Sequence, residues 1–250
     1  MSEIFRPMVF VESFCNLLDL RRMDWEINPG AGEAAGLVAN QDTLRYVSKE
    51  PFNKRVLPPA KGHTKNTLPN PLPEFLFGYN IACIPGFMQH REEYMPFICM
   101  AGAMVTCPYL VIAKCIQGSL TKAENEAFVA GCISLDVTWA VLEKDMVFIY
   151  ALMPYSCNLY VMWREVEEMC DQSGNPILDE AETPKRSPVY RIRLLDSFSV
   201  ARLSEAQRFR TLNFRIHRWA QENRLARIMS GLRDWEKRNF PRHMFMPTGR

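Results

Sequence analysis

The sequence lacks several patterns by which the function of a chain is usually recognised. No apolar run approaches the roughly 20 residues that a membrane-spanning helix needs. Neither a glycine-rich phosphate loop nor a Gly-x-Ser-x-Gly nucleophile turn occurs. The first residues carry an early acid and no basic-then-apolar order, so we expect no secretory signal. These absences favour an intracellular protein, nuclear or cytoplasmic, with no membrane partner.

The eight cysteines and four histidines form no metal-binding pattern. The cysteines are spread through apolar surroundings without Cys-x-x-Cys or Cys/His spacing. They are therefore interpreted as buried, reduced thiols of an intracellular protein. Apolar residues make up 48% of the chain and aromatic residues 11%, which is enough for a sizeable core. At 250 residues, the chain is one large domain or one domain with extensions.

The charge is small in total, at +2, but unevenly distributed. Residues 202–250 hold 12 Lys/Arg and 4 Asp/Glu, whereas the rest of the chain holds 18 and 24. The extra acids concentrate in residues 165–182. A basic C-terminal region is compatible with a nucleic-acid surface, for which Arg215, Arg218 and Arg227 are candidates, and equally with a solvated helix.

The chain divides into an N-terminal extension over residues 1–70 and a main domain over 71–250. In the extension, helices are predicted over residues 8–20 and 33–46, with residues 43–47 continuing or ending the second helix. The proline-rich residues 51–73 predict an extended loop.

Apolar runs and turn residues predict an α/β domain after residue 73. Residues 95–104 are compatible with a strand or a helix, and Ser119 is a good N-cap for a helix over 120–142. The prediction is a mixed sheet of about four or five strands flanked by helices. The predicted strands cover residues 74–81, 109–116, 145–153, 159–166 and 189–195.

The C-terminal region carries two apolar sets with helical spacing. Phe209, Leu212, Ile216 and Trp219 are spaced 3, 4 and 3 residues apart, and a second set from Leu225 to Trp235 repeats that spacing. Six residues separate the sets, which shifts the stripe. The pattern predicts two helices or one bent helix, packed on the core.

Four charged residues around one predicted strand suggest phosphodiester chemistry. Glu74 precedes one apolar strand and Lys114 ends another, and Glu124 and Glu126 follow on a helix. Hydrolysis of a phosphodiester uses a metal to neutralise charge and activate water, and Mg²⁺ prefers carboxylate and phosphate oxygens. A nearby lysine orients the water or stabilises developing charge. The same residues are also compatible with a surface acid, a lysine reaching water and ordinary first-turn helix acids.

These motifs together resemble the PD-(D/E)XK (restriction-endonuclease-like) nuclease superfamily, and most of all the nuclease-like domains of uncharacterised fungal proteins. The similarity covers roughly residues 70–235. It includes Pro73-Glu74, the strand ending near Lys114, the Gly118-Ser119-Leu120 turn with its helix, and Trp219 followed by Arg224-Leu225. The resemblance implies a restriction-endonuclease-like core, nucleic acid (DNA or RNA) as the partner, and Mg²⁺ if the protein is active.

Members of the family typically end the strand before the turn with Glu-x-Lys. This sequence departs from that pattern at the acid. Aligned from Pro108 without a gap, the strand puts Ala113 at the acid position and Cys115 at the lysine position. A one-residue slip instead keeps Lys114 as the lysine and puts Ile112 at the acid position. Neither register supplies an acid.

In some members of the superfamily the acid lies on the adjacent helix, which would be Glu124 or Glu126 here. Neighbours two apart on a helix point about 200° apart, and Glu124 lies on the apolar side, so Glu124 is favoured as the inward acid. The predicted catalytic set is therefore Glu74, Lys114, Glu124 and Glu126, with Glu74 and Glu124 as metal ligands. Three hypotheses stay open: a divergent nuclease, a non-catalytic descendant that binds nucleic acid, and a protein-interaction subunit.

Overall fold

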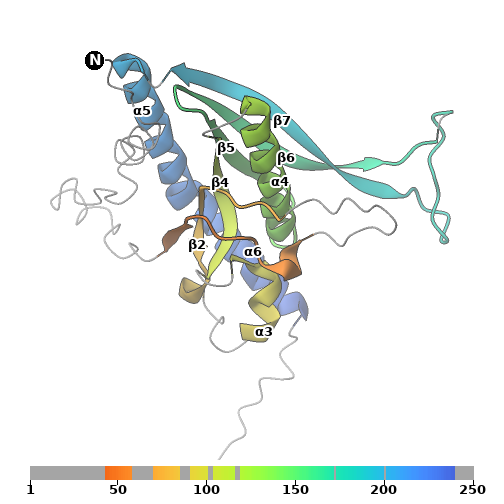
Figure 1. Ribbon diagram of the computed structural model, residues 1–250. Coiled ribbons are helices and arrows are strands. Elements are labelled where there is room, and N and C mark those ends of the chain that lie inside the picture. Colours follow the sequence, from red (N-terminus) through yellow and green to blue (C-terminus); the bar gives the residue numbers. More distant parts are fainter. Residues whose placement is uncertain are drawn as a thin grey trace, which may run out of the picture.

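The computed structural model describes residues 43–57, 70–84, 91–100, 104–115, 119–171, 173–199 and 201–239. The helix predicted over residues 8–20 and most of the one over 33–46 lie outside the described residues. Within them, the chain forms a mixed sheet with helices on both faces (Figure 1). The strands are β1 (Leu44–Val47), β2 (Phe75–Asn80), β3 (Ile98–Met100), β4 (Val105–Lys114), β5 (Met146–Leu152), β6 (Ser156–Glu168) and β7 (Arg186–Ser199). The helices are α3 (Arg91–Tyr94), α4 (Leu120–Trp139), α5 (Leu203–Trp219) and α6 (Leu225–Asn239), with short 3-10 turns at Lys54–Val56, Ile81–Cys83 and Met95–Phe97.

The sheet has seven strands in the order β1-β2-β4-β5-β6-β7, and β3 pairs with β4 outside this path. Among these pairings, β4 and β5 are parallel and the others are antiparallel. The predicted α/β class and mixed sheet are confirmed, but the count of four or five strands was too low. The two added strands, β1 and β3, have four and three residues, which is too short for a periodic signal.

The segment from Thr43 to Val47 is a correction to the sequence prediction, because it does not continue or end a helix. Leu44–Val47 forms β1 and pairs antiparallel with β2, from Leu44 opposite Tyr79 to Val47 opposite Leu76. The Tyr46 ring packs against Phe75 and Phe77, at centroid distances of 6.2 and 5.6 Å. Tertiary pairing therefore decides the conformation of this segment, as it often does for short strands.

Helix α4 connects β4 to β5 and covers one face of the sheet. Its buried positions are mostly small residues, which allow the helix to approach the strands closely. A Cβ added at Gly131 would lie 2.7 Å from Ile149 Cδ1 and 2.9 Å from Met162 Sδ, so a larger residue there would require these two side chains to shift. Ile149 and Met162 therefore mark the face that α4 covers.

Helices α5 and α6 cover the opposite face. Aromatic side chains join α5 to the sheet: Phe209 meets Tyr150 at 4.6 Å and Trp219 meets Phe148 at 5.4 Å between ring centroids. Between α5 and α6 lies a five-residue π-helical segment, Ala220–Arg224, in an otherwise continuous helical run. The predicted shift of the apolar stripe is thus produced by a π-helical turn.

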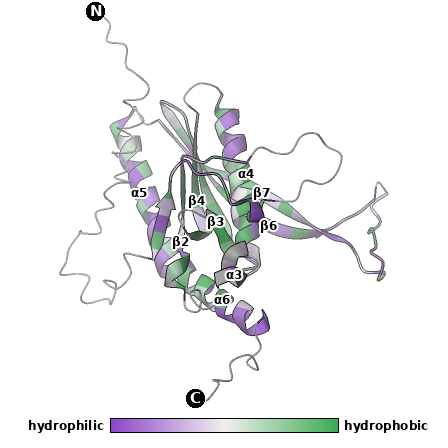
Figure 2. Ribbon diagram, turned by 60° about the horizontal axis from the view of Figure 1, so that its bottom comes forward, coloured by the Kyte–Doolittle hydropathy of each residue, from purple (hydrophilic) through white to green (hydrophobic). Residues whose placement is uncertain are grey.

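Strands β6 and β7 run out from the body as a two-stranded arm (Figure 1). The base of the arm is fixed to α4, because Tyr190 donates a hydrogen bond to Asp136 at 2.5 Å and the Arg164 guanidinium lies 4.2 Å from the Trp139 ring centroid. The outer part of both strands is exposed. The central strands are mainly hydrophobic, whereas the arm and the outer sides of α5 and α6 carry many hydrophilic residues (Figure 2). No helix in the described ranges is long and apolar enough to cross a membrane.

Candidate functional site at the end of strand β4

The C-terminal end of β4 brings two of the predicted site residues together. Because β2 runs antiparallel to β4, the residue before β2 lies beside the last residue of β4. Lys114 Nζ lies 3.7 Å from Glu74 Oε1, and the two side chains are only 12% and 14% exposed. A second lysine, Lys49, approaches the same oxygen at 3.6 Å from a largely exposed position. The site therefore contains one carboxylate between two ammonium groups.

The register of β4 shows on which face of the sheet Ile112, Ala113 and Lys114 lie. Ile112 pairs with Phe75 and with Tyr150, so it lies on the face covered by α5. Residues two apart on a strand share a face, so Lys114 lies on the same side as Ile112, and Ala113 lies on the α4 side. In the slipped register predicted from the sequence, Lys114 is the lysine and Ile112 takes the acid position. Ile112 is fully buried.

Glu124 lies in a different polar cluster, between α4 and β6. It accepts hydrogen bonds from the Tyr160 hydroxyl and from Asn158 Nδ2, the latter at 3.3 Å. Burial, followed by the bond to Glu124, raises the pKa of Tyr160 to about 12. Strand β6 is two strands from β4, or about 10 Å across the sheet. Glu124 makes no hydrogen bond or ion pair with Glu74 or Lys114 among the described residues.

Glu126 contacts the chain just before the site. Its Oε1 accepts a hydrogen bond from the backbone N–H of Leu72 at 3.1 Å, two residues ahead of Glu74. This bond ties the first turns of α4 to the segment that leads into β2. Glu126 thus supports the position of Glu74 without contacting Lys114.

The donor set does not fit the Mg²⁺ site predicted from Glu74 and Glu124. Mg²⁺ is usually held by one or two carboxylates together with substrate phosphates and waters. Here Glu74 is already paired with two lysines and Glu124 is hydrogen-bonded to β6. Across the described ranges, no group of three or more His, Cys, Asp or Glu side chains could hold a metal ion.

The three arginines predicted to contact nucleic acid lie on the C-terminal helices. Arg215 and Arg218 are exposed on α5; Arg218 pairs with Glu222 at 2.9 Å, and Arg215 has no hydrogen bond or ion pair within the described part of the chain. Arg227, on α6, donates to the Lys144 carbonyl at 2.6 Å. Arg215 and Arg218 therefore share one helix, while Arg227 holds the loop between α4 and β5.

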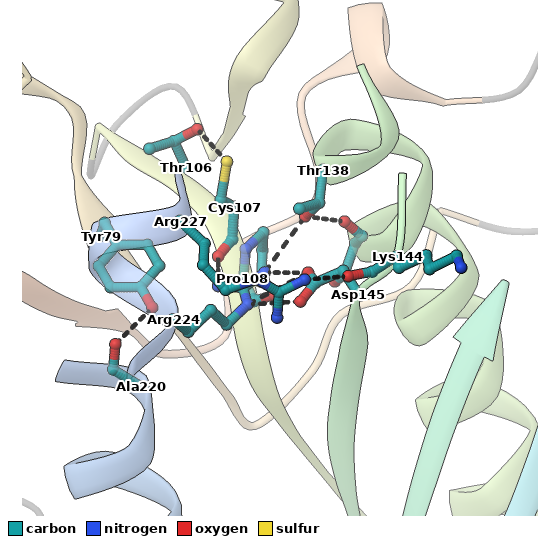
Figure 3. A network of polar contacts seen from close by, with 11 residues as sticks. Tyr79, Thr106, Cys107, Pro108, Thr138, Lys144, Asp145, Ala220, Arg224 and Arg227 are labelled. Carbon is teal, nitrogen blue, oxygen red and sulfur yellow. Dashed lines mark hydrogen bonds and ion pairs between the residues drawn. The ribbon is translucent and has the colours of Figure 1, made fainter. Parts of the chain in front are cut away.

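The opposite end of β4 carries a charge cluster that the sequence did not reveal. Arg224 is fully buried and donates to both Asp145 oxygens, with Nε at 2.9 and 3.1 Å (Figure 3). Its other nitrogens donate to the carbonyls of Cys107 and Pro108, at 2.7 and 3.1 Å. Nη2 of Arg224 also donates to the Thr138 hydroxyl oxygen at 3.4 Å. Every arm of the guanidinium thus has a partner.

Burial and charge act against each other in this cluster. Burial alone would lower the pKa of Arg224, but attraction to Asp145 outweighs it and the pKa is raised. Burial raises the pKa of Tyr79 to about 12, although the Arg224 guanidinium, 5.4 Å from the Tyr79 ring centroid, opposes that shift. The Tyr79 hydroxyl donates to the Ala220 carbonyl at 2.9 Å, which fixes the start of the π-helical segment.

A buried histidine adjoins the same cluster. The Tyr109 hydroxyl lies 2.8 Å from His217 Nδ1, and the Tyr79 and Tyr109 rings are 5.7 Å apart. Burial lowers the pKa of His217 to about 4, so the imidazole is neutral in the folded protein. In the sequence, Arg224 was noted only as part of the feature formed by Trp219 and Arg224-Leu225, which gave no sign of its burial.

Comparison with known proteins adds no relative. No protein-family model, no curated protein and no solved structure matches this chain.

Proposed function

We propose that this protein is a non-catalytic descendant of the PD-(D/E)XK nucleases that binds nucleic acid through α5 and α6. The observation that carries the proposal is Ile112, buried at the acid position beside an otherwise recognisable Glu74–Lys114 pair. An aliphatic side chain cannot bind a metal ion or a proton. The pair therefore serves as an ion pair at the end of the sheet.

The helical surface supplies the positive charge that phosphate binding needs. Residues 201–239 hold ten Lys/Arg and four Asp/Glu, and of the ten only Arg224 is buried. Arg208, Arg210, Arg215 and Arg218 are exposed on the single helix α5. Contacts to phosphate release counterions, so the affinity should fall as the salt concentration rises.

Two measurements on the full chain test the proposal. Labelled DNA and RNA, single- and double-stranded, are incubated with Mg²⁺ or Mn²⁺, and we expect no cleavage. Binding is followed by fluorescence anisotropy between 50 and 200 mM salt, a range over which several phosphate contacts weaken binding strongly. Arg215→Glu with Arg218→Glu should weaken it further, whereas Arg186→Glu on the arm serves as a matched exposed control.

Two results would contradict the proposal. Metal-dependent cleavage that disappears in Glu74→Ala would show an active enzyme. Binding that is unchanged by the charge reversals on α5 would show that these helices do not form the nucleic-acid surface.

The arm favours a second function, contact with a protein partner. Residues 165–182 contain seven acids and no Lys or Arg, and they lie on the outer arm. Asp171 accepts the backbone N–H groups of Asn175 and Ser173, which hold its pKa below the usual range. The Thr183 hydroxyl and nearby backbone N–H groups do the same for Asp179. The tip therefore stays negatively charged.

Shortening the arm separates the two functions. Residues 169–185 are replaced by a two-residue turn, which leaves α5 and α6 intact. A stable protein partner that is lost with the tip, together with no nucleic-acid affinity of the intact chain, would select the protein-interaction function. Unchanged nucleic-acid affinity after shortening supports the first proposal.

A further inference from the structure

Phe214 is an aromatic side chain placed on the outer side of α5. It is 61% exposed, whereas Phe209 and Ile216 of the same helix are buried against the sheet. The inner side of α5 is already completed by these apolar residues, so Phe214 adds nothing to the core. A single exposed apolar side chain is common on protein surfaces, so the significance of Phe214 depends on its neighbours.

The ring is bracketed by arginines at one-turn spacing. Arg210 and Arg218 stand four residues before and after Phe214, which places all three on one face, with about 6 Å of helix rise between neighbours. Arg215 follows directly. Arg210 and Arg215 make no hydrogen bond or ion pair among the described residues, and Arg218 pairs with Glu222. Free positive charge therefore flanks the ring.

We infer that this face of α5 binds single-stranded nucleic acid, with one base stacked on Phe214 and the flanking phosphates held by Arg210, Arg215 and Arg218. The inference rests on the proposed function and narrows its ligand from nucleic acid in general to single strands. Stacking needs an open π-face, which an unpaired base presents and a paired base inside a duplex does not. The arginines attract the phosphates by charge, and stacking on the Phe214 ring favours an unpaired base over a paired one.

The same helix offers a matched control for apolar exposure. Leu203 is 74% exposed at the start of α5, about three turns before Phe214. It has apolar surface but no ring. If α5 simply presented apolar surface to a protein partner, Leu203 and Phe214 would contribute in the same way, and an aliphatic residue would replace Phe214.

The test compares one oligonucleotide as a single strand and as a duplex, by fluorescence anisotropy at fixed salt. Phe214→Ala should raise the single-strand Kd roughly 5- to 150-fold, the effect of losing one base–aromatic stack, and leave the duplex Kd unchanged. Phe214→Trp should retain the affinity and Phe214→Leu should not. Leu203→Ala should change neither Kd. Circular dichroism verifies that each variant is folded.

Two further outcomes separate this inference from the proposed function. If charge reversal at Arg215 and Arg218 weakens binding while Phe214→Ala changes nothing, or if Phe214→Leu binds like wild type, the stacking site is wrong and the proposed function stands. If the wild-type chain binds neither form, both are overturned.

Discussion

The two ends of strand β4 each hold a cation against a carboxylate, and the two pairs differ in how completely they are satisfied. At the N-terminal end, Arg224 and Asp145 are 0% and 3% exposed and are joined by several hydrogen bonds. At the C-terminal end, Lys114 and Glu74 retain some exposure and lie 3.7 Å apart, beyond hydrogen-bonding distance. The first pair has a full set of partners, and the second has room for others.

This difference separates a fully buried and hydrogen-bonded ion pair from one that keeps some exposure to solvent. A buried charge is tolerated when its partner and hydrogen bonds are complete, and removing one partner is costly. The Lys114 and Glu74 side chains are 12% and 14% exposed and share no hydrogen bond, so we expect the loss of one partner to cost less. The same strand thus carries a fully satisfied ion pair at one end and a looser one at the other.

The largest expected effect is at the buried end. Arg224→Leu leaves the Asp145 carboxylate buried without its cation, so the free energy of unfolding should fall by about 3–5 kcal/mol. Urea denaturation measures it. Arg233→Leu, at an exposed position of α6, is the matched control and should cost less than about 0.5 kcal/mol. Equal losses in the two variants would show that the cluster does not stabilise the fold.

The next prediction concerns the pH dependence of the free energy of unfolding, through the buried His217. His217 has a pKa of about 4 in the fold, against an ordinary value near 6.5. The unfolded state therefore binds more protons between these values, and stability falls as the pH drops from 6.5 towards 4, by about 3 kcal/mol from this group. His217→Gln should remove this component of the pH dependence. An identical pH profile in the variant and the wild type would contradict the burial of a neutral imidazole.

A third prediction concerns Ile112, near the other end. Ile112→Glu places a carboxylate on the strand face shared with Lys114. We expect Mn²⁺ to stabilise this variant by up to about 2.7 kcal/mol at one hundred times its Kd. Ile112→Gln has the same shape without charge and should show no such shift in thermal unfolding. A Mn²⁺-dependent shift in the wild-type protein would mean that the existing residues already hold a metal.

The smallest effect is at the exposed end. Glu74→Gln removes one partner of Lys114 and should cost about 1 kcal/mol, because the two groups are 3.7 Å apart and share no hydrogen bond. The coupling energy between Glu74→Gln and Lys114→Met, from a double-mutant cycle in urea, should be similarly small. If Glu74→Gln lowered the free energy of unfolding as much as Arg224→Leu, the two ion pairs of β4 would contribute equally to stability and the comparison would be wrong.

Strong local patterns account for the elements that the sequence predicted well. The strand before Ile81, the helix after Ser119 and the strands on either side of residue 155 all appear, with ends shifted by a few residues. Helix α4 ends at Trp139, three residues earlier than predicted. Strands β6 and β7 are longer than predicted, because the arm is stabilised by pairing between its own strands and its exposed residues show no apolar alternation.

The remainder depends on contacts between residues distant in sequence. The segment Leu44–Val47 forms a strand because it pairs with β2, some 30 residues later in the chain. Glu74 and Lys114 were selected from a resemblance in the sequence, and the antiparallel pairing of β2 with β4 brings them together. The hydrogen-bond partners of Glu124, Asn158 and Tyr160, lie 34 and 36 residues away on β6, and no local sequence pattern predicts these contacts. Arg224 was noted as part of a motif, but its burial depends on Asp145, 79 residues earlier.

That separation has a consequence for synthesis of the chain. Asp145 and the carbonyls of Cys107 and Pro108 leave the ribosome well before Arg224, which is 117 residues after Cys107. Until α5 and α6 emerge and dock, the N-terminal end of β4 has no cation, and the Asp145 carboxylate just before β5 would be buried without its partner. The sheet therefore becomes fully stable only after residue 224 has emerged, and a ribosome stalled before that residue should present a chain that chaperones and proteases still recognise as incompletely folded.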